Sequence, residues 1–358
     1  MDTLTHGLAG ALLARALPPE SGTPDPILRR REAWLGFWTA MLPDADALLS
    51  PFSAEFYITQ HRGLSHSFVM LPLWAVLLGA VAAWRWNGGW RRFALVSGLG
   101  VVSHILLDWI TSWGTMFFSP LSWNRYSLDW VFILDFVLSG LLTIGIVGMI
   151  LLARRGDTPS RAGARASLVA SCLYIALCAQ RHQQALALVD TRGALATAVI
   201  PQPLSPDRWL ILSDDGKSVS ASFVDLSRHG ADPRRPLSVD AVQRFSPSLT
   251  DIDLLLGRLD LLFRSVDDPR PRIIPKTDGP LAVRTLAESA NGIFNRFARF
   301  PAARETLRAD GTTEVLLRDV RFGYLAPAVD PFTYVVRYDA AGGIVFAGFP
   351  SERWGGRK

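Results

Sequence analysis

Charge is scarce in the first half of this 358-residue chain. Residues 1–189 contain no lysine, 14 arginines and 11 acidic residues, so that 25 of 189 are charged. The remaining 169 residues contain 44 charged ones, about twice the density. A soluble domain needs a charged surface, so a segment with so little charge is expected to lie in lipid. The imbalance excludes a wholly soluble protein and a disordered chain.

Cysteine is scarce too, and several common catalytic motifs are missing. Cys172 and Cys178, the two cysteines, both fall in an apolar stretch, which predicts packed thiols and excludes a disulfide scaffold. The chain has no Walker-type phosphate loop, no Gly-x-Ser-x-Gly elbow and no His-Glu-x-x-His helix. The net charge of +5 comes from arginines between apolar runs rather than from one basic face, so no nucleic-acid partner is expected. The sequence leaves the oligomeric state open.

Long apolar runs dominate the first half instead. They cover residues 3–17, 33–50, 68–84, 92–111, 130–153 and 167–180. A spanning helix needs about 20 residues. The run at 130–153 meets this length, whereas the first, second and last runs are short. The pattern predicts a mainly α, polytopic membrane bundle of about five to six apolar helices over residues 1–189.

The arginines between these runs predict a topology. Ten arginines fall in every second loop (Arg29, Arg30, Arg31, Arg85, Arg91, Arg92, Arg154, Arg155, Arg161 and Arg165). The alternate loops, 51–67 and 112–129, carry only Arg62 and Arg125. Basic loops face the cytoplasm, so the alternate loops and the chain after about residue 190 are expected outside. If the last run does not span, the C-terminal part lies in the cytoplasm instead.

The composition becomes that of a soluble domain after a proline-rich boundary near Pro201. Strands are predicted at 208–213, 218–225, 313–320 and 333–338, the last joined by a hairpin to 344–348. Residues 250–264 and 283–300 are predicted to be helical. Residues 200–358 therefore form a small, soluble α+β C-terminal domain.

Imidazoles and carboxylates recur at the ends of the apolar runs. His104 and Asp108 are four residues apart, share one helix face and can bind one ion. An ionisable pair within an apolar helix is costly and indicates function. The predicted metal ligands are His6, Asp44, His61, His66, His104 and Asp108. The arginine topology places all of them at the same membrane face, although it uses different residues.

Three further residues are candidates for roles beside the metal. Asp46 is a further ligand or an orienter of one, and Arg62 is a candidate for binding a substrate phosphate or carboxylate. Asp135, five residues into an apolar run, is either a partner of a ligand histidine or a packed polar residue. Imidazole together with carboxylate suits zinc, manganese or iron rather than calcium. Zinc, as one or two ions, is expected, with manganese as the alternative.

These motifs resemble the YdjM-like family of bacterial inner-membrane proteins, described as metal-dependent hydrolases. The matching pieces are Thr5-His6-Gly7-Leu8, Leu42-Pro43-Asp44-Ala45-Asp46, His61-Arg62-Gly63-Leu64-Ser65-His66-Ser67 and His104-Ile105-Leu106-Leu107-Asp108 with Thr111-Ser112-Trp113-Gly114-Thr115. They cover about the first 150 residues. The resemblance implies an inner-membrane location, a bound metal and hydrolysis, but no particular substrate.

The sequence therefore predicts an integral-membrane hydrolase in which metal-activated water attacks an ester or phosphoester. A site at headgroup depth on the periplasmic face favours a lipid or another amphiphilic small molecule as substrate. The alternative is a transporter or ion-handling protein that uses the same cluster. Against it, the ionisable groups gather at one face and offer few candidates for a path across. A non-catalytic scaffold with a structural metal is a third possibility.

Overall fold

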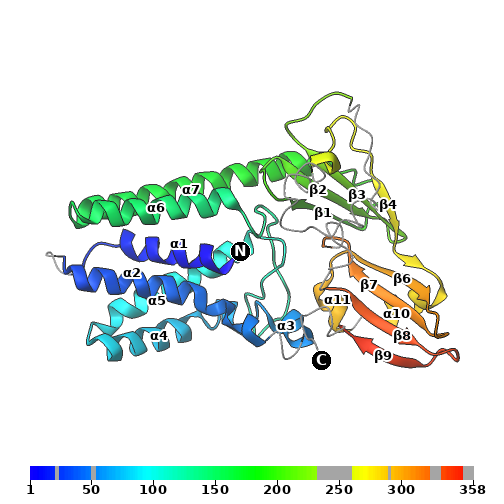
Figure 1. Cartoon of the computed structure of the whole chain (residues 1–358), viewed down its shortest axis with the longest axis horizontal. Helices are drawn as coiled ribbons and strands as arrows, with labels where there is room; N and C mark the ends of the chain where they lie inside the picture. Colours follow the sequence, from blue (N-terminus) through cyan, green and yellow to red (C-terminus); the bar gives the residue numbers. More distant parts are fainter. Residues whose placement is uncertain (21–23, 50–53, 232–259, 289–291, 323–331, 350–358) are drawn as a thin grey trace. The chain divides into compact units, whose positions relative to one another are not determined.

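The computed structural model describes residues 1–20, 24–49, 54–231, 260–288, 292–322 and 332–349. The chain divides into two compact units, one formed by residues 1–48 with 60–180 and the other by 49–59 with 181–358. The first unit is a helical bundle, and the second contains two β-sheets (Figure 1). Each unit is described separately below.

Helices α1, α2 and α4–α7 overlap the six predicted apolar runs, whereas the short helix α3 lies in the predicted loop 51–67. Their bounds are α1 Thr3–Ala16, α2 Pro26–Met41, α3 Ala54–Gln60, α4 Leu71–Trp86, α5 Trp90–Trp109, α6 Phe136–Ala153 and α7 Asp157–Leu186, with short 3₁₀ helices η1 Leu42–Leu49 and η2 Leu64–His66. Local chemistry sets several ends. The carboxylates of Asp2 and Asp135 accept backbone N–H bonds at the starts of α1 and α6. Asn87, in the left-handed conformation, ends α4.

The number of membrane-capable helices is smaller than the predicted five to six. Among the described residues, α5, α6 and α7 are long and apolar enough to cross a membrane, and the bent pair Glu55–His66 with Leu71–Trp86 makes a fourth if it counts as one span. Helix α1 has 14 residues and α2 has 16. At 1.5 Å per residue they reach about 21 and 24 Å, short of the roughly 30 Å hydrocarbon core. The prediction of five to six spans is therefore not confirmed.

Glycines bring the backbones of α1, α2 and α5 close together. A Cβ atom on Gly10 of α1 would lie 2.1 Å from the carbonyl oxygen of Gly36 in α2. A Cβ atom on Gly100 of α5 would lie 2.3 Å from the hydroxyl of Thr39 in α2. Neither contact leaves room for a larger residue, so these helices cross at glycine. Because α1, α2 and α5 carry or precede most of the predicted ligands, this packing sets the geometry of the site.

The C-terminal unit contains the five predicted strands and four further strands that were not predicted. Strands β1 Ala196–Pro201, β2 Arg208–Asp214, β3 Ser218–Asp225 and β4 Arg272–Pro275 form an antiparallel sheet in that order. The second sheet has the order β5 Thr277–Asp278, β6 Pro301–Leu307, β7 Thr313–Asp319, β8 Tyr334–Tyr338 and β9 Ile344–Gly348. Only its β5–β6 pair is parallel. Strands β2, β3, β7, β8 and β9 confirm the predicted strands; β1, β4, β5 and β6 were not predicted.

The predicted helices of this unit are shorter in the structure. In place of one helix over 283–300, α10 covers Pro280–Glu288 and α11 covers Ile293–Phe297, and β6 begins at Pro301. Of the helix predicted over 250–264, residues 250–259 lie outside the described residues, and 260–262 are helical. In α7, Cys178 is buried as expected, whereas Cys172 is exposed rather than packed.

Candidate metal site

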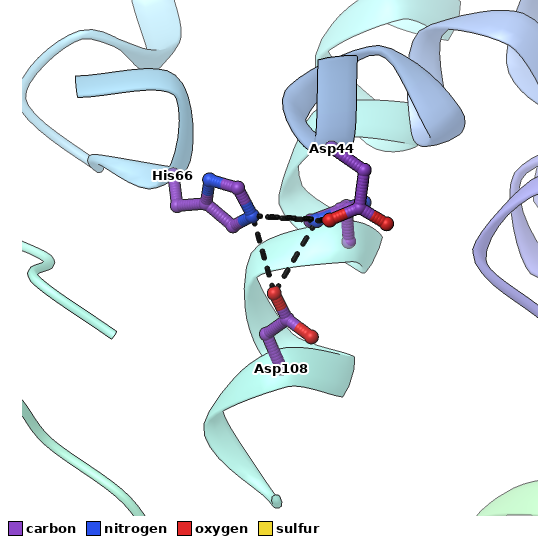
Figure 2. A group of neighbouring side chains, drawn as sticks. Asp44, His66 and Asp108 are labelled. Atoms are coloured by element: carbon purple, nitrogen blue, oxygen red, sulfur yellow. Dashed lines mark hydrogen bonds and ion pairs between the residues drawn. The ribbon is translucent and has the colours of Figure 1, made fainter. Parts of the chain in front are cut away.

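Four of the six predicted ligands meet at one end of the helical bundle. Asp44 lies in η1 just after α2, His66 ends η2, and His104 and Asp108 lie one turn apart on α5. One ligand atom from each lies within 4.8 Å of the others. Figure 2 shows His66 and the carboxylates of Asp44 and Asp108 directed toward one another. His66, His104 and Asp108 have fully buried side chains, and that of Asp44 is 11% exposed.

The distances within this group are short. The Nε2 atoms of His66 and His104 lie 2.9 Å apart. Asp108 Oδ2 lies 3.2 Å from the first and 3.3 Å from the second. Asp44 Oδ1 lies 3.6 and 3.5 Å from the same two nitrogens. Two nitrogens and two carboxylate oxygens therefore surround one point.

Hydrogen bonds on the far side of each ring assign the tautomers. His104 Nδ1 lies 2.6 Å from the carbonyl oxygen of Ala40, which can only accept, so this nitrogen carries the proton. Ser65 donates its hydroxyl to Asp46 at 2.8 Å and can therefore accept from His66 Nδ1, also at 2.8 Å. When both rings are neutral, both Nε2 atoms present lone pairs to each other. Such a pair requires a positive charge, either a bound cation or an added proton on one ring.

Each carboxylate accepts hydrogen bonds at one oxygen and directs the other toward the central point. Thr3 donates its hydroxyl to Asp44 Oδ2 at 2.7 Å, which leaves Oδ1 for the central point. Asp108 Oδ1 accepts from the amino group of Met1 and from Arg62 Nη2, the latter at 2.8 Å. Asp108 Oδ2 is buried and has no hydrogen-bond partner among the described residues. Outer groups that orient ligands in this way are typical of metal sites, so the donor set fits a divalent cation.

Both carboxylates of η1 are ionised at neutral pH. Burial alone would raise the pKa of Asp44, but the neighbouring imidazoles of His66 and His104 lower it well below its usual range. Burial also opposes ionisation of Asp46, and the hydrogen bond and charge of His61 lower the pKa of Asp46 below its usual value. With Asp108, they bring three carboxylates to this end of the bundle, where Arg62 and the Met1 amine pair with Asp108.

The other two predicted ligands lie beside the four rather than among them. His6 of α1 stacks on His104 with ring centroids 3.7 Å apart, and its Nε2 lies 3.3 Å from Asp108 Oδ1. The His61 ring nitrogen Nδ1 lies 2.7 Å from Asp46 Oδ1. His6 therefore packs against the back of the group, and His61 belongs to a neighbouring pair with Asp46.

The three residues predicted to act beside the metal have separate surroundings. Asp46 contacts His61 and Ser65, as an orienting residue would. Arg62, with φ at 64° and 2% exposure, directs its guanidinium to Asp108 and to the hydroxyl of Thr111 rather than outward to a substrate. Asp135 accepts the backbone N–H of Leu138 and the hydroxyl of Tyr174, so it caps α6. Neither of these hydrogen bonds reaches the four ligands.

Sequence reasoning missed several partners of the ligands, among them Thr3 and the carbonyl of Ala40. The hydroxyl of Thr3 orients Asp44 across 41 residues of sequence, and the Ala40 carbonyl orients His104 across 64. A backbone carbonyl carries no sequence signal. Thr3 follows the capping residue of α1, a position that predicts a helix start and nothing more.

The membrane-capable helices and this buried His/Asp group define a helical membrane protein whose side chains could hold a metal ion. The chain belongs to the family described as YdjM inner membrane protein, whose model matches residues 1–185 and so includes all four side chains. The likeness noted from the motifs is thereby confirmed.

Two relatives match shorter stretches. The inner membrane protein YbcI of Escherichia coli K12 is 33% identical over 116 residues, which cover 30% of this chain and 65% of that protein. The uncharacterized protein YfhP of Bacillus subtilis 168 is 29% identical over 125 residues, or 34% of this chain and 38% of that protein. The match thus spans about two fifths of YfhP and just under two thirds of YbcI. No solved structure matches the chain.

Proposed function

We propose that this protein is an integral-membrane, metal-dependent hydrolase that cleaves an ester or phosphoester. The observation that carries the proposal is the convergence of four acceptors, Asp44 Oδ1, His66 Nε2, His104 Nε2 and Asp108 Oδ2, within 4.8 Å. Two imidazoles with two carboxylates suit zinc first and manganese second. These four residues would hold one ion.

A divalent ion bound here would supply Lewis acidity and lower the pKa of a water molecule to near neutrality. The chain's own residues would manage protons and charge around it. The Asp46 carboxylate accepts the Nδ1–H of His61 at 2.7 Å, an orientation that suits an imidazole acting as proton acceptor. Arg62 and the Met1 amine balance the charge of Asp108 and fix its orientation.

Access to the site favours the side formed by η1. The side chains of Asp44, Asp46 and His61 are 11, 17 and 9% exposed, whereas His66, His104 and Asp108 are fully buried. A substrate would therefore approach past Asp44 and Asp46, next to the proposed proton acceptor. Because these carboxylates are ionised, they would repel an anionic substrate. The bound metal would have to offset this repulsion for such a substrate to enter.

We further propose a multi-pass topology with the site on the periplasmic face and an amphiphilic substrate from the headgroup region. The alternation of arginine-rich and arginine-poor stretches between the apolar runs of the sequence supports this orientation. Cysteine labelling tests it: in a Cys-free background, a membrane-impermeant maleimide should label Asn124→Cys in intact spheroplasts and Asn87→Cys only after lysis. Both residues are exposed. The reverse pattern would place the site on the cytoplasmic face.

Hydrolysis is tested with purified protein in detergent, reconstituted with zinc or manganese. It should cleave a lipid phosphoester or a chromogenic ester, and His66→Ala and Asp108→Ala should each abolish turnover while the helical content is unchanged. His229→Ala is the matched control, because His229 is 72% exposed in the C-terminal unit. Metal flux into proteoliposomes without hydrolysis would instead support the transporter that the same cluster could serve.

A further inference from the structure

The end of the helical bundle away from the His/Asp group gathers arginines far in excess of acidic residues. Figure 1 shows the start of α2 and the α4–α5 and α6–α7 turns at this end. The stretches that form it, here called the arginine-rich end, are residues 15–20, 24–34, 84–92 and 151–165. They contain eleven arginines, no lysine and four acidic residues. Hydrogen bonds join them, because Arg31 donates to the Trp86 carbonyl at 3.2 Å and Arg165 to the Ala16 carbonyl at 3.0 Å.

The buried charges of the arginine-rich end pair with one another, whereas several exposed arginines do not. Glu32 and Asp157, two of the four acidic residues, form ion pairs with arginines that are buried or half-buried. The other two, Glu20 and Asp25, are exposed. Within the part of the chain that the structure describes, five exposed arginines have neither an ion pair nor a side-chain hydrogen bond: Arg30, Arg85, Arg91, Arg154 and Arg155. These five exposed arginines outnumber the two exposed carboxylates.

Tryptophan side chains indicate that the arginine-rich end lies at the depth of the lipid headgroups. Trp34, Trp84 and Trp90 are exposed, and each lies within four residues of one of the five exposed arginines. Helices α5, α6 and α7, which are long and apolar enough to cross a membrane, begin or end here. Tryptophan is enriched where membrane proteins cross the interface between hydrocarbon and water. The exposed guanidinium groups are therefore expected at the level of the phospholipid phosphates.

We propose that the arginine-rich end binds the headgroups of anionic phospholipids. A guanidinium group donates two parallel hydrogen bonds to phosphate oxygens, and basic clusters beside a membrane-spanning helix attract anionic lipid. A zwitterionic phospholipid brings one positive charge with each phosphate and would leave the excess uncompensated. The charge balance therefore favours an anionic headgroup such as that of phosphatidylglycerol. The five exposed arginines belong to α2, α4, α5 and the α6–α7 turn, so bound headgroups would link helices that are distant in sequence.

Electron spin resonance on the full-length protein in phosphatidylcholine vesicles tests the preference for anionic lipid. A trace of spin-labelled phosphatidylglycerol or phosphatidylcholine is added, and the fraction of label whose motion the protein restricts gives the relative association constant. We expect phosphatidylglycerol to associate at least about fivefold more strongly, the gain that one arginine beside a charged surface provides. High salt should reduce this preference. Equal association of the two lipids would overturn the proposal, and the exposed arginines would then suit an acidic protein instead.

Paired substitutions locate the binding. Arg85→Gln with Arg91→Gln, and Arg154→Gln with Arg155→Gln, should each lower the preference for phosphatidylglycerol by about threefold or more, because each pair removes two positive charges. The side chains are exposed, so the melting temperature should stay unchanged. Arg85→Lys with Arg91→Lys keeps the charge and should retain most of the preference. A loss as large as that of the glutamine pair would overturn the role of charge.

Arg192→Gln with Arg284→Gln is the matched control for loss of two positive charges. Both arginines are exposed in the C-terminal unit and form ion pairs there, Arg192 with Asp190 and Arg284 with Glu288. This double variant should keep the full preference for phosphatidylglycerol. An equal loss in the control, or no loss in either glutamine pair of the arginine-rich end, would overturn the proposal.

Discussion

The two ends of the helical bundle carry buried charged groups that differ in how their hydrogen bonds are satisfied. At the end where α1 finishes and α2 begins, Arg29 is 2% exposed. Its guanidinium donates to Asp157 Oδ1 at 3.0 Å, to the carbonyl oxygens of Arg15 and Leu17 at 2.7 and 2.9 Å, and to Glu32. One arginine thus links the ends of α1, α2 and α7.

Arg92 of α5 completes this first group. It donates to Glu32 at 2.6 Å and to the carbonyl oxygen of Pro18 at 2.8 Å. Arg15 donates to Ser160 at 2.8 Å. Both carboxylates of the group are paired with arginines, and the arginines also satisfy carbonyl groups that a helix end leaves without a partner. Asp157 Oδ2 has no hydrogen-bond partner among the described residues, but Arg161 Nη1 lies 3.7 Å from it. Every carboxylate of the group thus has arginines beside it, and the group ties four helices together.

The second group, Asp44, His66, His104 and Asp108, begins 12 residues further along α5, about 18 Å away by helical rise. There the acceptors outnumber the donors, and Asp108 Oδ2 has no hydrogen-bond partner among the described residues. Burial of charge is common to both ends and therefore does not identify function. A surplus of convergent acceptors distinguishes the second group and suits a cation, which would satisfy it.

Breaking the first group should give the largest effect on stability. Arg29→Met leaves Glu32 and Asp157 buried without this partner, and we expect a loss of about 3–5 kcal/mol in the free energy of unfolding. Denaturant titration in detergent measures this loss, which should be the same with and without a metal chelator. Arg30→Met is the control, since Arg30 is exposed and should change stability by less than about 0.5 kcal/mol. Equal losses in the two variants would contradict the contrast between the ends.

Adding metal should stabilise the second group only. Zinc at 100 times its dissociation constant should raise the free energy of unfolding of the wild-type protein by about 2.7 kcal/mol. Asp108→Asn should lose this increment and its bound metal in elemental analysis, as should His104→Ala. Glu32→Gln should keep the increment while starting from a lower stability. A wild-type protein that binds no metal would remove the basis of the proposed function.

Local sequence signals predicted much of the bundle but not how many helices cross the membrane. Apolar runs predict helices because the residues of one run lie on one helix, so the signal is local. Crossing depends also on neighbours: α1 buries nine of its 14 residues, and α2 places Arg29 and Glu32 inside the bundle. In the structure, Arg29 and Arg92, counted as loop charges in the sequence, lie within α2 and α5 and make internal ion pairs.

For the site, sequence spacing was sufficient only where the partners are on one helix. His104 and Asp108 follow from their four-residue spacing, as the 3.3 Å contact shows. Asp44 and His66 come to them through the glycine-mediated crossing of helices and through the turn at Arg62, which depend on tertiary packing. Likewise, a strand such as β6, with the sequence Pro-Ala-Ala-Arg-Glu-Thr-Leu, lacks an alternating apolar pattern and is stabilised by pairing with β7.

A smaller effect should follow from loosening one ligand of the second group. Ser65→Ala removes the hydroxyl between Asp46 and His66 Nδ1, so His66 loses the partner that fixes its tautomer. We expect zinc affinity to fall by about 10- to 100-fold. Competition with a chromophoric chelator measures it. Ser103→Ala is the control, because Ser103 is next to His104 but donates to the Gly100 carbonyl of its own helix. A similar loss in both variants would mean that α5, and not His66, had been disturbed.

The smallest effect should come from Thr3, the hydroxyl that holds Asp44 Oδ2. Asp44 is the ligand with some exposure, at 11%, so water can replace the lost donor in part. Thr3→Val should therefore cost about 1 kcal/mol of metal-binding free energy, which is a roughly fivefold larger dissociation constant for zinc. Thr3→Ser should restore the wild-type affinity. Thr5→Val removes a buried hydroxyl from the same helix whose partners are Asp2 and Ser139, and it should alter stability without altering zinc affinity. If Thr3→Val instead abolished binding, Asp44 would depend on this one donor, and the exposed edge of the site would be more rigid than its 11% exposure implies.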